Sequence, residues 1–283
     1  MSHKKSVWLQ RALLGGAMLL GAGSAAAEYG LNMTPGVTNV SGEVYHLHML
    51  IFYICCAIAV VVFGAMFYSI WKHRKSVGAE AANFHESTTV EIIWTVIPFA
   101  ILISMAIPAT KALINLEDAS DPDMTVKITG YQWKWHYAYP EEQIAFFSSL
   151  DAKSNEARQL GSSVDPASVE DYLLNVDNRL VLPVGKKVRF LITSNDVIHS
   201  WWVRDLGWKK DAIPGFINEA WTRVEEPGVY RGQCAELCGK DHGFMPIVVE
   251  FKAQADYDAW VAAQKAQAGN SKSPVATVVA AVN

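Results

Sequence analysis

The sequence predicts a two-helix transmembrane hairpin followed by an all-β domain. Residues 50–71 and 92–110 carry no charged side chain, and each stretch is long enough to cross a bilayer as a helix. From about Asn115 onward, short runs of β-branched and aromatic residues are separated by Gly, Pro, Asn and Asp, which is typical of a β sandwich or barrel. A soluble helical hairpin is the alternative for the first part of the chain.

The first 27 residues predict a secretory signal peptide. Lys4, Lys5 and Arg11 precede an apolar run at residues 12–22, and the small residues 25–27 fit a cleavage site before Glu28. The run is too short to cross a bilayer core of about 30 Å, although a short membrane anchor is the alternative. We therefore expect residues 28–114 to hold an N-terminal segment and the hairpin.

The positions of the basic residues predict how the hairpin is oriented. Lys72, Arg74 and Lys75 lie between the two apolar stretches, whereas residues 28–49 contain no Lys or Arg. Because basic loops tend to stay in the cytoplasm, both ends of the hairpin should lie outside. Pro98 and Pro108 in the second stretch favour packing against another protein, which would satisfy the carbonyl groups that proline leaves free.

We expect the β domain to occupy residues 115–252. Strand-like runs lie at 126–139, 188–193, 228–231 and 246–251, whereas the polar stretch 141–172 is predicted to be a long excursion from the core. Strand alternation would put five aromatic residues on one face, namely Tyr131, Trp133, Trp135, Tyr137 and Tyr139. Residues 253–283 should form a short helix at about 256–267 and a flexible tail.

The charge of the chain indicates what kind of partner it binds. The formal net charge is −4, and removal of the predicted signal peptide, which holds no acidic residue, makes the remainder more acidic. An acidic exported protein is a poor candidate for nucleic acid and a good one for a basic protein, because complementary fields steer encounter. We therefore expect no nucleic-acid partner.

The four cysteines form two pairs with different meanings. Cys55 and Cys56 are adjacent in the first apolar stretch and are most simply small packing residues. Cys234 and Cys238 lie in a polar segment, where two cysteines of an exported protein would ordinarily form a disulfide.

Three further side chains change the interpretation of the second pair. The segment reads Cys234-Ala-Glu236-Leu-Cys238-Gly-Lys-Asp-His242-Gly-Phe-Met245, and His199 follows the strand-like run at 188–193. Two thiolates, two imidazoles and a thioether together favour copper. A single-copper site needs only one cysteine, whereas two thiolates can bridge two copper ions. Spreading one electron over that core should keep geometry changes small and electron transfer fast.

Two alternatives remain for these residues. A structural zinc site would use two cysteines and two histidines, but it would leave Met245 without a role, and zinc-finger spacings differ from this one. A disulfide between Cys234 and Cys238 would account for neither the histidines nor the methionine.

Several other motifs accompany this segment: Glu91-Ile-Ile-Trp94-Thr-Val-Ile-Pro98, Gly130-Tyr-Gln-Trp133-Lys-Trp135, Val176-Asp-Asn-Arg-Leu-Val-Leu-Pro183, His199-Ser-Trp201 and Asp211-Ala-Ile-Pro-Gly215. Together with the two-helix anchor, they resemble subunit II of cytochrome c oxidase, of the bacterial aa3-type haem-copper class, over nearly the whole chain after residue 27. The resemblance implies a cupredoxin-like β-barrel. It also implies a CuA centre of two copper ions, bound by His199, Cys234, Cys238, His242, Met245 and the backbone carbonyl of Glu236.

The resemblance implies roles for further residues. The Glu236 carboxylate would face a Mg²⁺ (or Mn²⁺) ion shared with subunit I, since hard cations take oxygen ligands. Trp133 would accept electrons from cytochrome c, and a role in aromatic packing is the alternative. Glu91 would sit at the mouth of a proton-uptake path, and a helix-capping or interfacial acid is the alternative. Four acids would dock cytochrome c or extend its patch, and each is otherwise a solvated carboxylate: Asp177, Asp196, Glu141 and Glu142.

The implied function is electron transfer. Cytochrome c would reduce the copper centre, which would pass electrons to subunit I for reduction of O2 to water with coupled proton translocation. The protein would be a multi-pass protein of the bacterial inner membrane, in contact with lipid and other oxidase subunits, with both termini periplasmic. The chain contains no Cys-x-x-Cys-His, so we expect no fused cytochrome domain.

Three other classes of protein fit less well. A quinol oxidase subunit lacks the copper ligands, and a nitrous-oxide-reducing enzyme needs a large second domain. A copper-delivery or storage protein usually has exposed, exchangeable ligands, whereas we expect Trp201, Trp202 and Phe244 to bury this loop.

Overall fold

The structure, a computed structural model, describes residues 32–83 and 85–270 of the chain. The predicted signal peptide at residues 1–27 lies outside the described residues, and so does the last part of the predicted tail.

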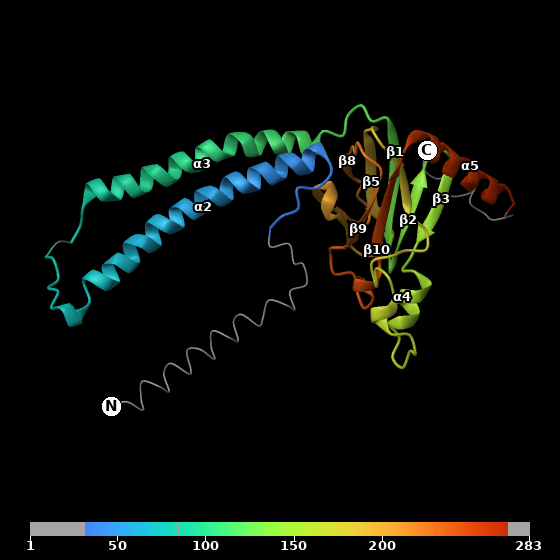
Figure 1. The fold of residues 1–283 in the computed structure, drawn as a ribbon. Helices are drawn as coiled ribbons and strands as arrows, with labels where there is room; N and C mark the ends of the chain where they lie inside the picture. Colours follow the sequence, from blue (N-terminus) through green and yellow to red (C-terminus); the bar gives the residue numbers. More distant parts are fainter. Residues whose placement is uncertain (1–31, 84, 271–283) are drawn as a thin grey trace. The chain divides into compact units, whose positions relative to one another are not determined.

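Two long helices form the predicted hairpin. Helix α2 spans Asn39–Lys72 and helix α3 spans Thr88–Glu117, with the short helix η2, Lys75–Val77, between them (Figure 1). Each contains one predicted span and continues beyond it at both ends. At about 1.5 Å per residue both helices are longer than a bilayer core of about 30 Å, so their end turns can reach the interface.

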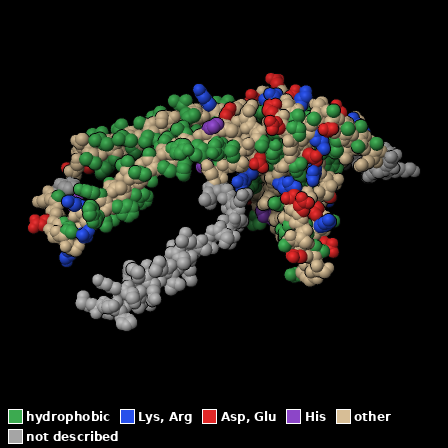
Figure 2. Space-filling view, in the orientation of Figure 1, with side chains coloured by type: hydrophobic (Ala, Val, Ile, Leu, Met, Phe, Trp, Pro, Cys, Tyr) green, Lys and Arg blue, Asp and Glu red, His purple; other side chains and the backbone are tan. Residues whose placement is uncertain are grey.

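The surface of this hairpin is apolar on all sides. None of the most apolar part of either helix is buried within the chain, and Figure 2 shows hydrophobic side chains covering both helices. A helix that is apolar all round is stable when lipid or other membrane helices surround it. The two helices are therefore long and apolar enough to cross a membrane. Cys55 and Cys56 are among the exposed residues.

The helix ends next to the β domain are hydrogen-bonded to it. Thr38 caps α2 through a capping box, in which its hydroxyl oxygen accepts from Ser41 N at 2.9 Å. The same hydroxyl lies 3.1 Å from the carbonyl oxygen of Leu206. At the end of α3, Trp221 Nε1 donates to the carbonyl oxygen of Asn115 at 3.0 Å. The anchor is therefore joined to the β domain by more than the covalent chain.

The β domain consists of two five-stranded sheets. The first has the order β3-β2-β1-β5-β8, and its strands are Ile144–Ser148, Lys134–Tyr139, Met124–Tyr131, Val188–Ser194 and Asn218–Thr222. The second has the order β4-β10-β9-β6-β7, and its strands are Leu180–Pro183, Pro246–Lys252, Gly228–Cys234, His199–Val203 and Trp208–Ala212. Two pairs, β1 with β5 and β4 with β10, are parallel, and the other pairs are antiparallel. The predicted fold class, a helical hairpin followed by an all-β domain, is confirmed.

Short helices complete the described chain. They are α4 at Ala152–Ala157, η3 at Pro166–Ser168, η4 at Arg204–Leu206, η5 at His242–Phe244 and α5 at Gln254–Asn270. Helix α5 corresponds to the helix predicted at about 256–267, with wider bounds.

Large aromatic side chains fill the core of the β domain. Trp135, Tyr137 and Tyr139 alternate along β2 and are fully buried, as are Phe190 and Trp201, whose rings stack at 5.6 Å. The Tyr139 hydroxyl bonds to both backbone groups of Val181 in β4, at 3.0 and 3.1 Å. This hydroxyl therefore connects a strand of the first sheet with a strand of the second.

Two predictions about this domain were wrong in part. The stretch 141–172 is not wholly an excursion, because its apolar run from Ile144 pairs with β2 as strand β3. Tyr131 and Trp133 do not share the buried face of β2, because β1 ends at Tyr131 and the chain turns at Gln132 and Trp133. The turn interrupts the alternation on which that prediction relied.

We predict that Tyr139→Phe lowers the free energy of unfolding by about 1–3 kcal/mol, because two buried backbone groups lose their hydroxyl partner. Thermal or urea denaturation of the purified chain in detergent measures this. Tyr131→Phe, which alters a half-buried ring at the end of β1, is the control and should change stability by less. Equal effects of the two substitutions would contradict the role of the Tyr139 hydroxyl.

Candidate metal centre

The candidate centre lies where three strand ends meet. We call residues 234–245 the cysteine loop: it begins at the end of β9, passes through η5 and ends where β10 starts. Strand β6 pairs with β9 so that Trp201 lies opposite Cys234. This register places His199, the first residue of β6, beside the start of the loop.

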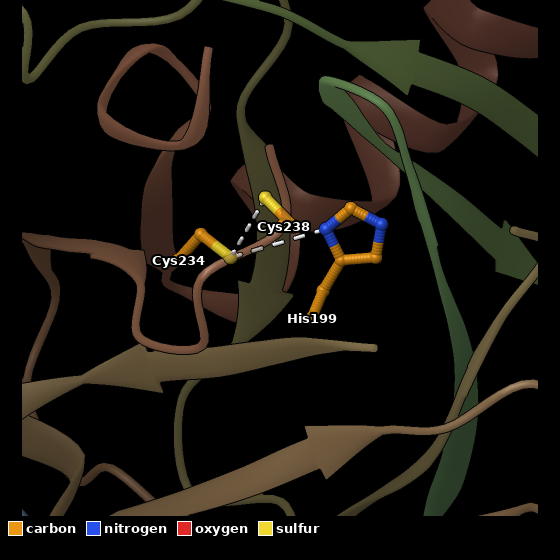
Figure 3. A group of neighbouring side chains, drawn as sticks. All are labelled: His199, Cys234 and Cys238. Atoms are coloured by element: carbon orange, nitrogen blue, oxygen red, sulfur yellow. Dashed lines mark hydrogen bonds between the residues drawn. The ribbon is translucent and has the colours of Figure 1, made fainter. Parts of the chain in front are cut away.

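The structure brings the predicted ligand atoms together. The Sγ atoms of Cys234 and Cys238 are 3.8 Å apart. His199 Nδ1 lies 3.9 Å from Cys234 Sγ, and His242 Nδ1 lies 3.5 Å from Cys238 Sγ. Figure 3 shows His199, Cys234 and Cys238 directed toward one another. Each thiol therefore has an imidazole of its own.

Two weaker donors complete the group. Met245 Sδ lies 3.5 Å from Cys238 Sγ, and the carbonyl oxygen of Glu236 lies 3.4 Å from Cys234 Sγ. The arrangement is thus nearly symmetric, with one thiol, one imidazole and one weak donor on each side. His199 and Met245 are at most 1% exposed, so water is largely excluded from this part of the site.

The imidazole of His199 is held in place by packing and by a carboxylate. A Cβ atom at Gly130 would come within 2.7 Å of the ring, so the close approach of the strand requires glycine there. His199 Nε2 lies 2.8 Å from Asp196 Oδ1. With Nε2 occupied by this hydrogen bond, Nδ1 is left to face Cys234, which is how ligating histidines are usually oriented.

The contact of Asp196 with His199 was not predicted from the sequence. Its carboxylate also accepts from the backbone N–H groups of Gln132 and Val197, each at 2.7 Å. The signal was available in the sequence, because Asp196 precedes His199 by three residues. It supports a role in holding His199, in addition to the predicted role in docking.

The two thiols differ in their tendency to ionise. Burial raises the pKa of Cys234, but hydrogen bonds with His199 and with backbone groups outweigh it and leave the pKa lowered. Burial and the nearby Cys234 raise the pKa of Cys238 to about 12. The same neighbours act on His199, where burial lowers the pKa and the contacts with Cys234 and Asp196 leave it raised. Two adjacent thiolates therefore need a cation between them.

The donor set fits copper better than the alternatives. Both cysteines are free, and their separation of 3.8 Å is far from the S–S bond length of about 2.05 Å. A tetrahedral zinc site would use the cysteines and histidines and leave Met245 unused, although its sulfur faces Cys238. Soft sulfur ligands combined with imidazole and a weak thioether are typical of copper sites.

Trp133 contacts the cysteine loop directly. Its Nε1 donates to the carbonyl oxygen of Cys238 at 3.2 Å, and Gln132 Nε2 donates to the same oxygen at 2.9 Å. The ring is half-buried, and Lys240 Nζ lies 5.5 Å from its centre. Trp133 thus has one edge at the surface and the other on a candidate ligand residue.

The other predicted residues lie farther away. Glu236 and Asp177 are exposed. Trp133 precedes β2, whereas Glu141 and Glu142 follow it, so the length of the strand, about 17 Å, separates them. The structure therefore does not bring the two acids together with Trp133. Glu91 is in the first turn of α3, at the end of that helix away from the β domain.

One expectation about the cover of the loop was wrong in part. Trp201 is fully buried and Phe244 is partly buried, but Trp202 is 37% exposed. Strand alternation along β6 explains this, because adjacent residues point to opposite faces of the sheet.

Comparison with known proteins finds matches to both the hairpin and the β domain. The family model described as the periplasmic domain of cytochrome c oxidase subunit II matches residues 124–252, and the model of its transmembrane domain matches residues 26–112. A probable cytochrome c oxidase subunit 2 of Rickettsia felis is 41% identical over 240 residues, which is 85% of this chain and 73% of that protein. Cytochrome c oxidase subunit 2 of Cereibacter sphaeroides is 33% identical over 278 residues, covering 91% of this chain and 92% of that protein.

A solved structure is also similar. The crystal structure of the periplasmic domain of subunit II of cytochrome oxidase from Bradyrhizobium japonicum has 38% sequence identity and a TM-score of 0.46. It covers 53% of this chain and 98% of that chain.

We predict that Asp196→Ala weakens copper binding about 10- to 100-fold, because His199 loses the partner that orients it. Competition with a copper chelator measures the affinity. Asp177→Ala is the control, since Asp177 also accepts two backbone N–H bonds, from Ser149 and Asn178, and these bonds do not involve His199. An unchanged affinity in Asp196→Ala would show that packing alone orients the ring.

Proposed function

The chain belongs to the cytochrome c oxidase subunit II family, and on that premise we propose that it relays electrons from cytochrome c to the catalytic subunit I. The family makes it a membrane-bound part of an oxidoreductase complex with a cupredoxin-like domain and a copper site. The proposal adds a dinuclear CuA centre as the relay. Subunit I would reduce O2 to water, with coupled proton translocation.

One observation carries the proposal: two thiols lie 3.8 Å apart, each with its own imidazole. Two copper ions bound there would supply a redox centre in which one electron is shared between the metals. Cys234, Cys238, His199 and His242 would hold the two ions. The burial of His199, Cys234 and Cys238 supports a relay with little rearrangement and argues against a copper-delivery protein, which needs exchangeable ligands.

Trp133 is the proposed residue through which electrons arrive. The hydrogen bond from its indole to the Cys238 carbonyl supports a short covalent and hydrogen-bonded path from the surface to the Cys238 sulfur. Asp177 is proposed to attract the basic face of cytochrome c, and so is Asp196 where its carboxylate reaches the surface. Glu141 and Glu142 would contribute only to the long-range field, given their distance from Trp133.

The partner that accepts electrons from the copper centre is proposed to be subunit I. Other oxidase subunits and membrane lipid would surround the hairpin. The Glu236 carboxylate is exposed although its carbonyl faces Cys234, which supports a shared Mg²⁺ (or Mn²⁺) ion at a subunit boundary. Glu91 would lie at a proton-uptake path on the cytoplasmic side. The chain would span the bacterial inner membrane twice, with both termini periplasmic.

We predict that Trp133→Ala slows reduction of the copper centre by cytochrome c at least tenfold, because the path from the surface loses its aromatic ring and its hydrogen bond. Stopped-flow mixing of reduced cytochrome c with the oxidase measures this step. Trp202→Ala, which changes an exposed tryptophan on β6, is the control. If Trp133→Ala oxidase accepts electrons as fast as the wild type, electrons enter elsewhere.

We also predict that Met245→Leu leaves copper bound but changes its reduction potential and slows turnover. The thioether would be a weak ligand, so its loss should tune the centre and leave it assembled. Redox titration of the copper absorption, together with oxygen consumption, tests this. An unchanged potential and rate would count against Met245 as a ligand.

A further inference from the structure

Residues 150–176, which we call the excursion segment, form a closed and internally hydrogen-bonded loop. An isolated β-bridge joins Leu150 to Val176, and Asp151 N donates to the Asn175 carbonyl at 3.1 Å, so the segment is closed at its base. Within it, the fully buried Ser154 accepts at Oγ from Leu173 N at 3.1 Å. These bonds give the segment a defined shape.

The segment contacts the cysteine loop through Arg158. Its Nη1 lies 3.3 Å from Asp241 Oδ1, and its guanidinium lies 4.2 Å from the centre of the Phe244 ring. Asn155 Oδ1 accepts from Arg158 Nε at 2.8 Å and so fixes the direction of the guanidinium. Asp241 adjoins His242 and Phe244 adjoins Met245, so Arg158 touches the neighbours of both proposed ligands.

A second ion pair attaches the same segment to the strand that leads into the loop. Asp171 pairs with Arg231, which lies on β9 three residues before Cys234. A pocket of about 160 Å³ at the Arg158 contact is lined in part by Trp133, Asn155, Asp241 and Phe244. The excursion segment therefore meets the cysteine loop and its supporting strand, and it lines a pocket together with the proposed electron-accepting residue.

The two halves of the metal centre are held in different ways. His199 is fixed by Asp196 and by close packing against Gly130. In the described part of the chain, His242 Nε2 has no hydrogen-bond partner, and His242 is more exposed than His199. The turn that carries it is held by two backbone bonds within the loop, His242 N to Gly239 and Phe244 N to Asp241, and Trp135 Nε1 donates to the carbonyl oxygen of Met245 at 3.3 Å.

We infer that Arg158 is a positioning residue that holds the 241–245 half of the cysteine loop against Cys238. The guanidinium fixes Asp241 by charge and Phe244 by stacking, and the turn between them then presents His242 and Met245 to Cys238. Both side chains of the ion pair are about one-quarter exposed, so solvent screens the pair less than a surface pair. This inference rests on the proposed copper centre.

The test is Arg158→Gln in the full-length, copper-loaded chain. We expect copper to pass to a chelator about tenfold faster, as is typical when a residue supporting a metal ligand is lost. The copper hyperfine splitting in electron paramagnetic resonance and the reduction potential should both shift. Arg158→Lys, which keeps the charge but loses the planar stack, should lie between wild type and Arg158→Gln.

The matched control is Arg179→Gln. Arg179 pairs with Glu250 at the same distance of 3.3 Å, and Glu250 lies on β10, outside the cysteine loop. It should leave spectrum, potential and copper release unchanged. If Arg158→Gln folds poorly, Asp241→Asn keeps the side-chain shape and breaks the same ion pair.

The outcomes separate this inference from the proposed function. Failure of the wild-type chain to bind two coppers would overturn the proposed function. A wild-type chain with two coppers, together with an Arg158→Gln spectrum, potential and release rate equal to those of Arg179→Gln, would overturn only the role of Arg158. A loss of thermal stability with an unchanged copper spectrum would do the same.

Discussion

The pairing of β6 with β9 is the constraint on which the rest of the site depends. It sets Trp201 opposite Cys234, and thereby puts His199 beside the first residue of the cysteine loop. A slip of one residue would turn His199 to the other face of the sheet and leave Cys234 without its imidazole. The aromatic core around Trp201 makes such a slip costly, because Trp201 would leave its fully buried position.

The support of the centre is uneven, and this follows from where each part lies in the chain. His199 is on a strand and is enclosed by Gly130 and Asp196. The other half is on a turn and is supported from outside by Arg158. A site that exchanges electrons without changing shape needs both halves held, since any freedom in one ligand would appear as rearrangement during transfer. The excursion segment supplies, through Arg158, contacts that hold Asp241 and Phe244 of this turn.

Much of this arrangement could be predicted from the sequence, and the reason differs for each part. The hairpin was predictable because uncharged stretches of this length suit only a membrane or a buried core. The ligand residues were predictable because their chemical types and close spacing favour one metal. The contact of Arg158 with Asp241 was not predictable, since these residues are far apart in the sequence and only the folded domain brings them together. Strand β3 was missed because most residues of the stretch 141–172 are polar, although a short apolar run begins at Ile144. The turn at Trp133 was missed because strand alternation was assumed to continue from β1 into β2.

Cys234 and Cys238 are proposed to hold two copper ions that share one electron. The most direct measurement is copper content combined with electron paramagnetic resonance of the purified full-length chain. Two coppers per chain are expected, with a hyperfine pattern from one unpaired electron spread equally over both nuclei, which Cys238→Ser should abolish. One copper with the pattern of a single nucleus, or bound zinc, would overturn the dinuclear centre.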